Sequence, residues 1–91
     1  MLMTTWKIEF DYKAAKEFQK LDQNSQKVIG DYLKNKVLQT AHPKDLGKPL
    51  KYDYVGLWRY RIGKYRIICN IEDENLIVLI LRLAIRDEVY T

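Results

Sequence analysis

Cysteine and histidine occur only once each among the 91 residues of this chain, as Cys69 and His42. A single cysteine excludes an internal disulfide and any metal site built from several thiolates. A single histidine, placed beside Pro43, gives little support to a histidine-based metal site or to histidine acid–base catalysis. We therefore expect no metal and no other cofactor. Cys69 falls on the apolar side of a predicted strand, so its expected role is that of a small buried side chain.

Long apolar segments are also missing from the sequence. No stretch approaches the ~20 apolar residues of a membrane-spanning helix, and residues 1–7 lack the apolar region of a signal peptide. These absences predict a soluble, cytoplasmic protein with no membrane partner. Met1 and Met3 are both candidate translation starts. The length suits one small domain, residues 1–91, with a single modest core.

Acidic residues are scarce in one part of the chain. The net charge of +4 is only mildly basic, but basic residues are concentrated between Gly47 and Ile71, where the single acidic residue is Asp53. The basic residues of this segment are Lys48, Lys51, Arg59, Arg61, Lys64 and Arg66. Such a segment is compatible with a nucleic acid or with an acidic protein as the partner.

The centre of this segment is typical of a β-hairpin. Two runs rich in β-forming residues flank Gly63 and Lys64, a pair that suits a two-residue turn. That turn fixes the register, so that Arg61 lies opposite Arg66 and Arg59 lies one alternate position along, ~6–7 Å away. These arginines therefore share one face of the hairpin. The opposite face carries Trp58, Tyr60, Ile62, Tyr65, Ile67 and Cys69.

Facing arginines are unusual in a sheet, because like charges directly opposite each other destabilise it. No acidic residue occurs between Leu57 and Ile71 to offset them. An anion site explains the arrangement, since the planar guanidinium binds phosphate through two parallel hydrogen bonds. The alternative is a solvated strand face whose acidic partners come from distant loops. We favour the anion site because several arginines converge on one face.

The remaining sequence predicts one strand and two helices before the hairpin and one strand after it. Residues 5–10 alternate apolar and polar side chains, as a half-buried strand does. Asp11 is placed to cap a helix over residues 12–21, and a second helix runs from 24 or 25 to about 39. Residues 40–56 form a loop anchored by Leu46 and Leu50, which carries Lys48 and Lys51 toward the arginines. Residues 76–81, with an extension to 84, are apolar on both faces, as in a central strand.

The order β-α-α-β-β-β predicts a two-layer α+β fold, with two N-terminal helices packed on a four-stranded, mainly antiparallel sheet. We expect the first strand beside the last, because this pairing buries the doubly apolar strand between two neighbours. The helices then cover Trp58, Tyr60 and Ile67 on one face of the sheet. The other face, which carries the arginines, stays open.

Several features occur together in this short chain. They are the order of elements, the Leu-Gly-Lys-Pro-Leu loop at residues 46–50, the basic hairpin at residues 58–67, and the ending Arg-Asp-Glu-Val-Tyr at residues 86–90. In these features the chain resembles the RelE-type toxins of type II toxin–antitoxin systems over almost its whole length. The resemblance implies a ribosome-dependent endoribonuclease that cleaves mRNA in the ribosomal A site and inhibits translation. It also implies a toxin–antitoxin hetero-oligomer with an acidic, RelB-like antitoxin.

The resemblance also assigns roles to individual residues. Arg66 matches the phosphate-binding arginine of the family, and the two arginines of the preceding strand match positions that are often lysine or arginine. Arg86 matches the arginine before the C-terminal motif, and Tyr90 matches a tyrosine that stacks on the substrate base or takes part in proton transfer. The candidate catalytic residues are Arg59, Arg61, Arg66, Arg86 and Tyr90, and the candidate RNA-binding residues are Lys48, Lys51 and Lys64.

The chain departs from its relatives near the C-terminus. Many relatives carry Gly-His before the last arginine, where this chain has Ala84-Ile85, so a histidine acid or base is missing from the expected place. The candidate general bases are then Lys48, Lys51 and Tyr90, with Glu88 as a weaker candidate. Two other functions stay open: a ParE-like inhibitor of DNA gyrase with the same fold, and a catalytically weak module that binds RNA or a protein partner.

Overall fold

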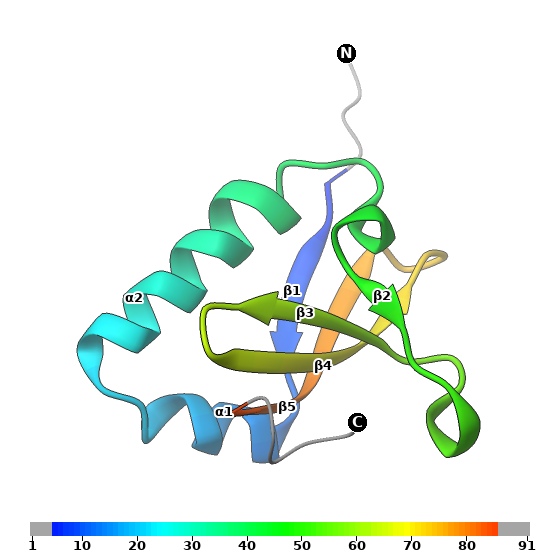
Figure 1. The fold of residues 1–91 in the computed structure, drawn as a ribbon. Coiled ribbons are helices and arrows are strands. Elements are labelled where there is room, and N and C mark those ends of the chain that lie inside the picture. The colour runs from blue at the N-terminus through cyan, green and yellow to red at the C-terminus, as the bar shows by residue number, and fades with distance from the viewer. Residues whose placement is uncertain (1–4, 86–91) are drawn as a thin grey trace.

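The computed structural model describes residues 5–85 of the chain. The sheet has five strands in the order β1-β5-β4-β3-β2 (Figure 1). The strands are β1 (Lys7–Phe10), β2 (Lys48–Pro49), β3 (Trp58–Ile62), β4 (Tyr65–Glu72) and β5 (Ile77–Ile85). The helices are α1 (Tyr12–Gln19) and α2 (Gln23–Tyr32), which continues as the π-helical turn η1 (Leu33–Val37), and the 3-10 helices η2 (Pro43–Leu46) and η3 (Tyr52–Tyr54).

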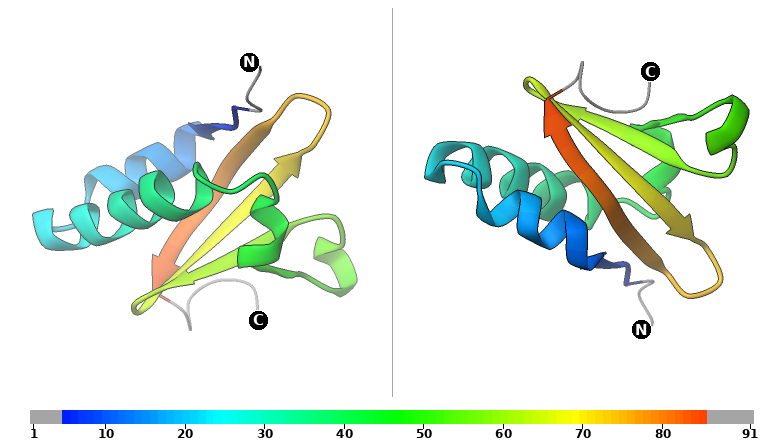
Figure 2. Two further views of the ribbon diagram at one scale, coloured as in Figure 1. Left: turned by 90° about the horizontal axis from the view of Figure 1, so that it is seen from above. Right: turned by 90° about the horizontal axis from the view of Figure 1, so that it is seen from below.

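The molecule has two layers. Both α-helices lie on the same side of the sheet (Figure 2). Strand β1 pairs in parallel with β5, and the other neighbouring strands are antiparallel. The predicted α+β class and the pairing of the first strand with the last are therefore confirmed. The core between the layers includes Trp6, Ala14, Ile29, Leu33, Val37, Tyr60, Ile67, Val78 and Ile80.

The β3–β4 hairpin has the predicted register. Arg61 pairs with Arg66, and Ile62 pairs with Tyr65. Gly63 has a φ of +58°, and it is followed by Lys64, which is not among the residues with positive φ. A positive φ at the first turn position alone is the signature of a type II′ turn, whose twist matches that of the flanking strands.

Helix α2 begins with a side-chain cap that the sequence pattern does not predict. The carboxylate of Asp22 accepts hydrogen bonds from the backbone N–H of Ser25 at 3.1 Å and from its hydroxyl at 2.7 Å. These bonds satisfy a backbone N–H that the first turn of the helix leaves without a partner. Asp11 occupies the corresponding position before α1, but its side chain forms no cap hydrogen bond. Asp11 is therefore the N-cap residue that the sequence predicted, but it lacks the side-chain hydrogen bond expected of a cap.

The sheet has one strand more than predicted. Strand β2 lies within the predicted loop and pairs with β3, with Lys48 opposite Arg59 and Pro49 opposite Trp58. Gly47 makes this close approach possible, because a Cβ atom there would lie only 2.6 Å from the carbonyl oxygen of Arg59. A strand of two residues is too short to show an alternating pattern, so the four-stranded sheet expected from periodicity was wrong.

A hydrogen bond from a core residue, rather than the side chain of Leu46, anchors the loop before β3. The buried hydroxyl of Tyr60 donates a hydrogen bond of 2.8 Å to the carbonyl oxygen of Pro43. Leu46 is 37% exposed, so its predicted anchoring role was wrong, whereas Leu50 is half-buried and its N–H donates to the carbonyl of Leu57 at 2.9 Å. A core tyrosine thus fixes the segment that carries β2 to the edge of the sheet.

Candidate functional site

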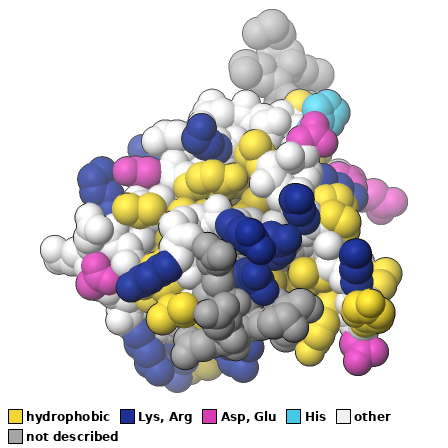
Figure 3. Space-filling view, in the orientation of Figure 1, with side chains coloured by type: hydrophobic (Ala, Val, Ile, Leu, Met, Phe, Trp, Pro, Cys, Tyr) yellow, Lys and Arg dark blue, Asp and Glu magenta, His cyan; other side chains and the backbone are white. Residues whose placement is uncertain are grey.

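The structure brings four basic residues onto one face of the sheet. Lys48 pairs with Arg59 across β2 and β3, and Arg61 pairs with Arg66 across β3 and β4. Directly paired residues point to the same side of a sheet, and residues two apart on a strand share a face. We call Lys48, Arg59, Arg61 and Arg66 the basic face. It lies opposite the side that packs under the helices, and Figure 3 shows basic side chains gathered over β3 and β4.

The basic face is not uniformly open. Lys48 and Arg61 are exposed, whereas Arg59 and Arg66 are half-buried. Ile68, which pairs with Arg59 and shares this face, is fully buried. The partners of Ile68 in the sheet are Arg59 on β3 and Arg82 on β5. Because Ile68 is buried, the expectation of an open face was wrong at this position. A guanidinium partly withdrawn from water attracts a phosphate more strongly than a fully solvated one.

Lys51 lies next to the basic face. It lines a hollow of about 300 Å³ together with Pro49, Leu50, Tyr52 and Arg59. The loop after β2 therefore places Lys51, a fifth cation, beside Arg59. The sequence predicted that this loop carries its lysines toward the arginines. Tyr52 was not among the predicted site residues. Its signal in the sequence is an aromatic residue next to a lysine in a segment bounded by proline and glycine.

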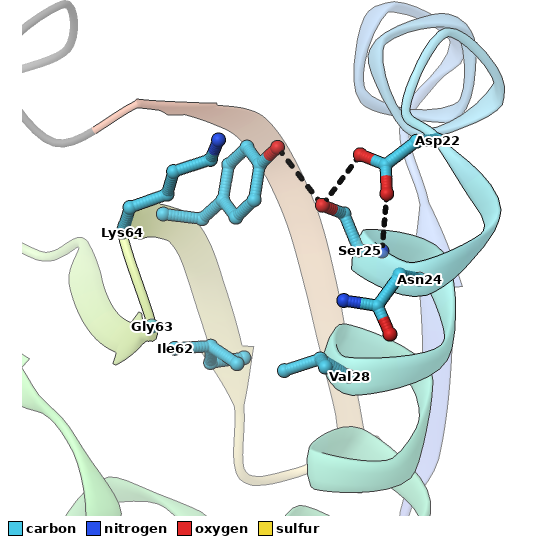
Figure 4. Close-up of a pocket in the computed structure, with 8 residues that line it drawn as sticks. Asp22, Asn24, Ser25, Val28, Ile62, Gly63 and Lys64 are labelled. Carbon is cyan, nitrogen blue, oxygen red and sulfur yellow. Dashed lines mark hydrogen bonds between the residues drawn. The ribbon is translucent and has the colours of Figure 1, made fainter.

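Lys64 lies apart from the other candidates. It sits in the hairpin turn with its Nζ 5.5 Å from the ring centroid of Tyr65, and Tyr65 belongs to the helix-covered face. Figure 4 shows Lys64 and Asp22 on opposite sides of a hollow between the turn and the start of α2. The hydroxyl of Tyr65 donates to Oγ of Ser25 at 3.2 Å. Hydrogen bonds from Ser25, with a smaller contribution from the charge of Lys64, hold the pKa of Asp22 below its usual value. The structure therefore directs Lys64 toward α2 rather than toward the basic face.

The C-terminal candidates, Arg86 and Tyr90, lie outside the described residues, as does Glu88. The last described strand contributes Ala84 directly beside Arg66. At this position the chain therefore offers a methyl group next to the central arginine.

Cys69 has the role that its position predicted. It is fully buried, and its thiol lies 3.6 Å from the carbonyl oxygen of Trp58 as a hydrogen-bond donor. Burial raises the pKa of the Cys69 thiol to about 12, so the reactive thiolate is scarce at neutral pH. Within residues 5–85, no group of three or more His, Cys, Asp and Glu side chains is arranged to hold a metal ion. Over the same residues, no helix is long and apolar enough to cross a membrane.

A comparison with families of known proteins shows which family the chain belongs to. The model of the family described as the ParE toxin of type II toxin–antitoxin systems, parDE, matches residues 8–90. The chain belongs to this toxin family. It is thus a toxin of a type II toxin–antitoxin system with the RelE/ParE fold, and the predicted resemblance is confirmed.

Individual relatives of this ParE-family toxin carry RelE-type names. The toxin RelE of Mycobacterium tuberculosis is 32% identical over 77 residues, which make up 85% of this chain and 77% of RelE. The toxin RelG of the same organism is 37% identical over 51 residues, 56% of this chain, and the match spans 59% of the length of RelG. The crystal structure of the toxin–antitoxin complex RelBE2 from M. tuberculosis is similar with a TM-score of 0.81 at 27% identity, covering 90% of this chain and 99% of the matched chain.

Proposed function

We propose that this toxin is a ribosome-dependent endoribonuclease that cleaves mRNA in the ribosomal A site and so inhibits translation. The observation that carries the proposal is the basic face, in which Arg61 stands directly opposite Arg66 and Lys48 directly opposite Arg59. Cations that share one face of a sheet attract the phosphate groups of an RNA backbone.

The chemistry that such a face supports is transfer of a phosphoryl group within the RNA. The ribose 2′-oxygen attacks the adjacent phosphorus, the bond from phosphorus to the 5′-oxygen breaks, and a 2′,3′-cyclic phosphate and a free 5′-hydroxyl result. The phosphorane that forms on the way carries extra negative charge. Preorganised donors at the site of developing charge supply the largest part of many rate enhancements. We assign this role to Arg61 and Arg66.

The proton transfers need further groups. A base takes the proton of the 2′-hydroxyl, and an acid gives one to the leaving 5′-oxygen. Lys48 and Lys51 are the described candidates for the base, and both lie beside Arg59. Tyr90 remains the candidate for stacking on the substrate base or for proton transfer, and Arg86 the candidate for charge stabilisation at the leaving group. The ribosome would hold the mRNA in the geometry for in-line attack.

We further propose that an acidic, RelB-like antitoxin neutralises the toxin by covering the basic face within a hetero-oligomer. The similar RelBE2 structure is that of a toxin–antitoxin complex, which supports a partner of this kind. Binding driven by the basic face should weaken as the salt concentration rises, because salt screens exposed charges.

Inhibition of DNA gyrase is the second candidate function, and the ParE description of the matching family favours it. Analysis of reaction products separates the two. The toxin is added to ribosomes programmed with a defined mRNA, and the RNA ends are examined. Ribosome-dependent cuts that leave a 2′,3′-cyclic phosphate support the nuclease. Intact RNA together with loss of supercoiling by gyrase supports the alternative.

A further inference from the structure

The loop of residues 51–56, between β2 and β3, presents apolar and aromatic side chains to solvent. Tyr52 is 87% exposed, Val55 is 75% exposed and Tyr54 is 38% exposed. The loop extends from one end of the sheet at the lower right of Figure 1. In the same region Figure 3 shows hydrophobic side chains with a basic side chain above them. Exposed aromatic residues grouped beside a cation are typical of a binding surface.

The backbone at Tyr52 is strained in a way that folding does not explain. Its φ is +59°, in the left-handed region, which costs an L-residue about 1–2 kcal/mol. A tyrosine that is 87% exposed gains little from burial in return. Strain that contributes nothing to stability is characteristic of functional positions. The strained and exposed conformation of Tyr52 therefore indicates a role in binding rather than in core packing.

The surroundings of Tyr52 show what it could bind. Tyr52 lines the hollow of about 300 Å³ with Lys51 and Arg59, and Arg59 pairs with Lys48 of the basic face. The volume is at the small end of the range for ligand sites. Asp53 follows in the same loop, and a carboxylate accepts hydrogen bonds from the exocyclic amino groups of bases. A nucleotide offers both a base with such amino groups and a phosphate that Lys51 and Arg59 attract.

We propose that Tyr52 is a stacking platform for one base of single-stranded RNA, with Lys51 and Arg59 holding the adjoining phosphates. The inference rests on the proposed function, because it extends the basic face into a subsite for a nucleotide that flanks the cleaved bond. A base stacked on an aromatic side chain contributes about 1–3 kcal/mol to binding. This subsite would set the position of the strand while the arginines act on the phosphate.

The test measures binding apart from cleavage. The probe is a fluorescein-labelled 2′-O-methyl RNA hexanucleotide, which lacks the attacking hydroxyl and cannot be cut. Its dissociation constant is measured by anisotropy for the wild-type toxin and for Tyr52→Ala, Tyr52→Gly and Tyr52→Phe. Tyr12→Ala is the matched control, because Tyr12 is 73% exposed on α1 with the Nζ of Lys16 4.8 Å from its ring centroid.

We expect Tyr52→Ala and Tyr52→Gly to raise the dissociation constant about 5- to 150-fold, while Tyr52→Phe and Tyr12→Ala change it less than about 3-fold. Tyr52→Gly should melt at the same or a higher temperature than wild type, because glycine adopts a positive φ without strain. Equal affinity of Tyr52→Ala and wild type would overturn the inference, and so would a lower melting temperature of Tyr52→Gly. Loss of antitoxin binding with unchanged RNA affinity would also overturn it.

The inference and the proposed function can fail separately. Tyr52-dependent binding of the uncleavable probe without any mRNA cleavage would support the subsite and refute the nuclease. Cleavage that proceeds equally well in Tyr52→Ala, with unchanged probe affinity, would support the nuclease and refute the subsite.

Discussion

Replacement of Gly47 by alanine is expected to destabilise the protein by separating β2 from β3. An ideal Cβ atom at this position lies 2.6 Å from the carbonyl oxygen of Arg59 and 3.1 Å from Cδ1 and Cε1 of Tyr60. Ordinary carbon contacts are about 3.5–4.0 Å long, so the strands must move apart by several tenths of an ångström or more. The backbone of Gly47 has a φ of −125° and a ψ of −169°, which alanine adopts freely. The cost is therefore steric.

Overpacking of this kind costs about 1–3 kcal/mol, and the lower entropy of the unfolded alanine chain returns about 0.4–1 kcal/mol. We expect Gly47→Ala to lower the free energy of unfolding by about 1–2 kcal/mol, as measured in urea, which corresponds to a melting temperature lower by about 4–16 °C. Gly30→Ala is the matched control. Gly30 lies within α2, and a Cβ atom added there would meet no atom within 4 Å, so alanine should add about 0.8–1 kcal/mol of helix propensity.

The two variants make the same chemical change and should shift stability in opposite directions. Because Lys48 follows Gly47 and pairs with Arg59, Gly47→Ala should also weaken RNA binding beyond its effect on stability. A Gly47→Ala protein as stable as wild type would refute the close packing of β2 on β3. Loss of stability in Gly30→Ala would refute the inference that a Cβ atom added at this position meets no neighbouring atom.

Two further effects concern stability. Glu17 accepts hydrogen bonds from Nε of Arg82 at 3.0 Å and from the N–H of Leu83 at 2.8 Å. Glu17→Ala should therefore lower the free energy of unfolding, measured in a urea titration, by about 1–3 kcal/mol. A decrease of less than about 0.5 kcal/mol would contradict this expectation. Burial raises the pKa of Cys69 to about 12 and raises the pKa of Tyr60 above its ordinary value. The unfolded chain therefore loses these protons first, and stability, followed by urea titration across pH, should fall as the pH rises above about 9. A midpoint that stays constant up to about pH 11 would show that neither group is buried in its neutral form.

The hairpin and the fold class could be predicted because each depends on local patterns. Gly63 specifies the turn, the turn sets the register, and strand alternation then places Arg61 and Arg66 on one face. The order of elements leaves one sheet for two helices to cover. The family resemblance rests on the same segments, and the family match spans them.

The remaining features depend on contacts between distant parts of the chain. Strand β2 exists because Gly47 lets two backbones approach, and its two residues carry no pattern of their own. A hydrogen bond from the hydroxyl of Tyr60 to the carbonyl oxygen of Pro43 fixes the loop before β3. The spacing of leucines in the sequence does not reveal this partner. Lys64 is close in sequence to the other basic residues, which suggested that it shares their site. In the structure, the hairpin turn directs Lys64 toward α2 instead. The exposed ring of Tyr52 depends on a positive φ that propensities do not anticipate.

The most direct test of the basic face is primer extension on an mRNA in a reconstituted translation system, with and without ribosomes. Wild type is compared with Arg61→Ala and with Lys13→Ala, a matched removal of one exposed cation from α1. Arg61 is exposed and faces Arg66, so its removal relieves repulsion and should leave the free energy of unfolding unchanged or higher. We predict ribosome-dependent cuts by wild type and Lys13→Ala, and cleavage at least about 100-fold slower by Arg61→Ala. Cleavage by folded Arg61→Ala at the wild-type rate would contradict the assignment of the site to the basic face.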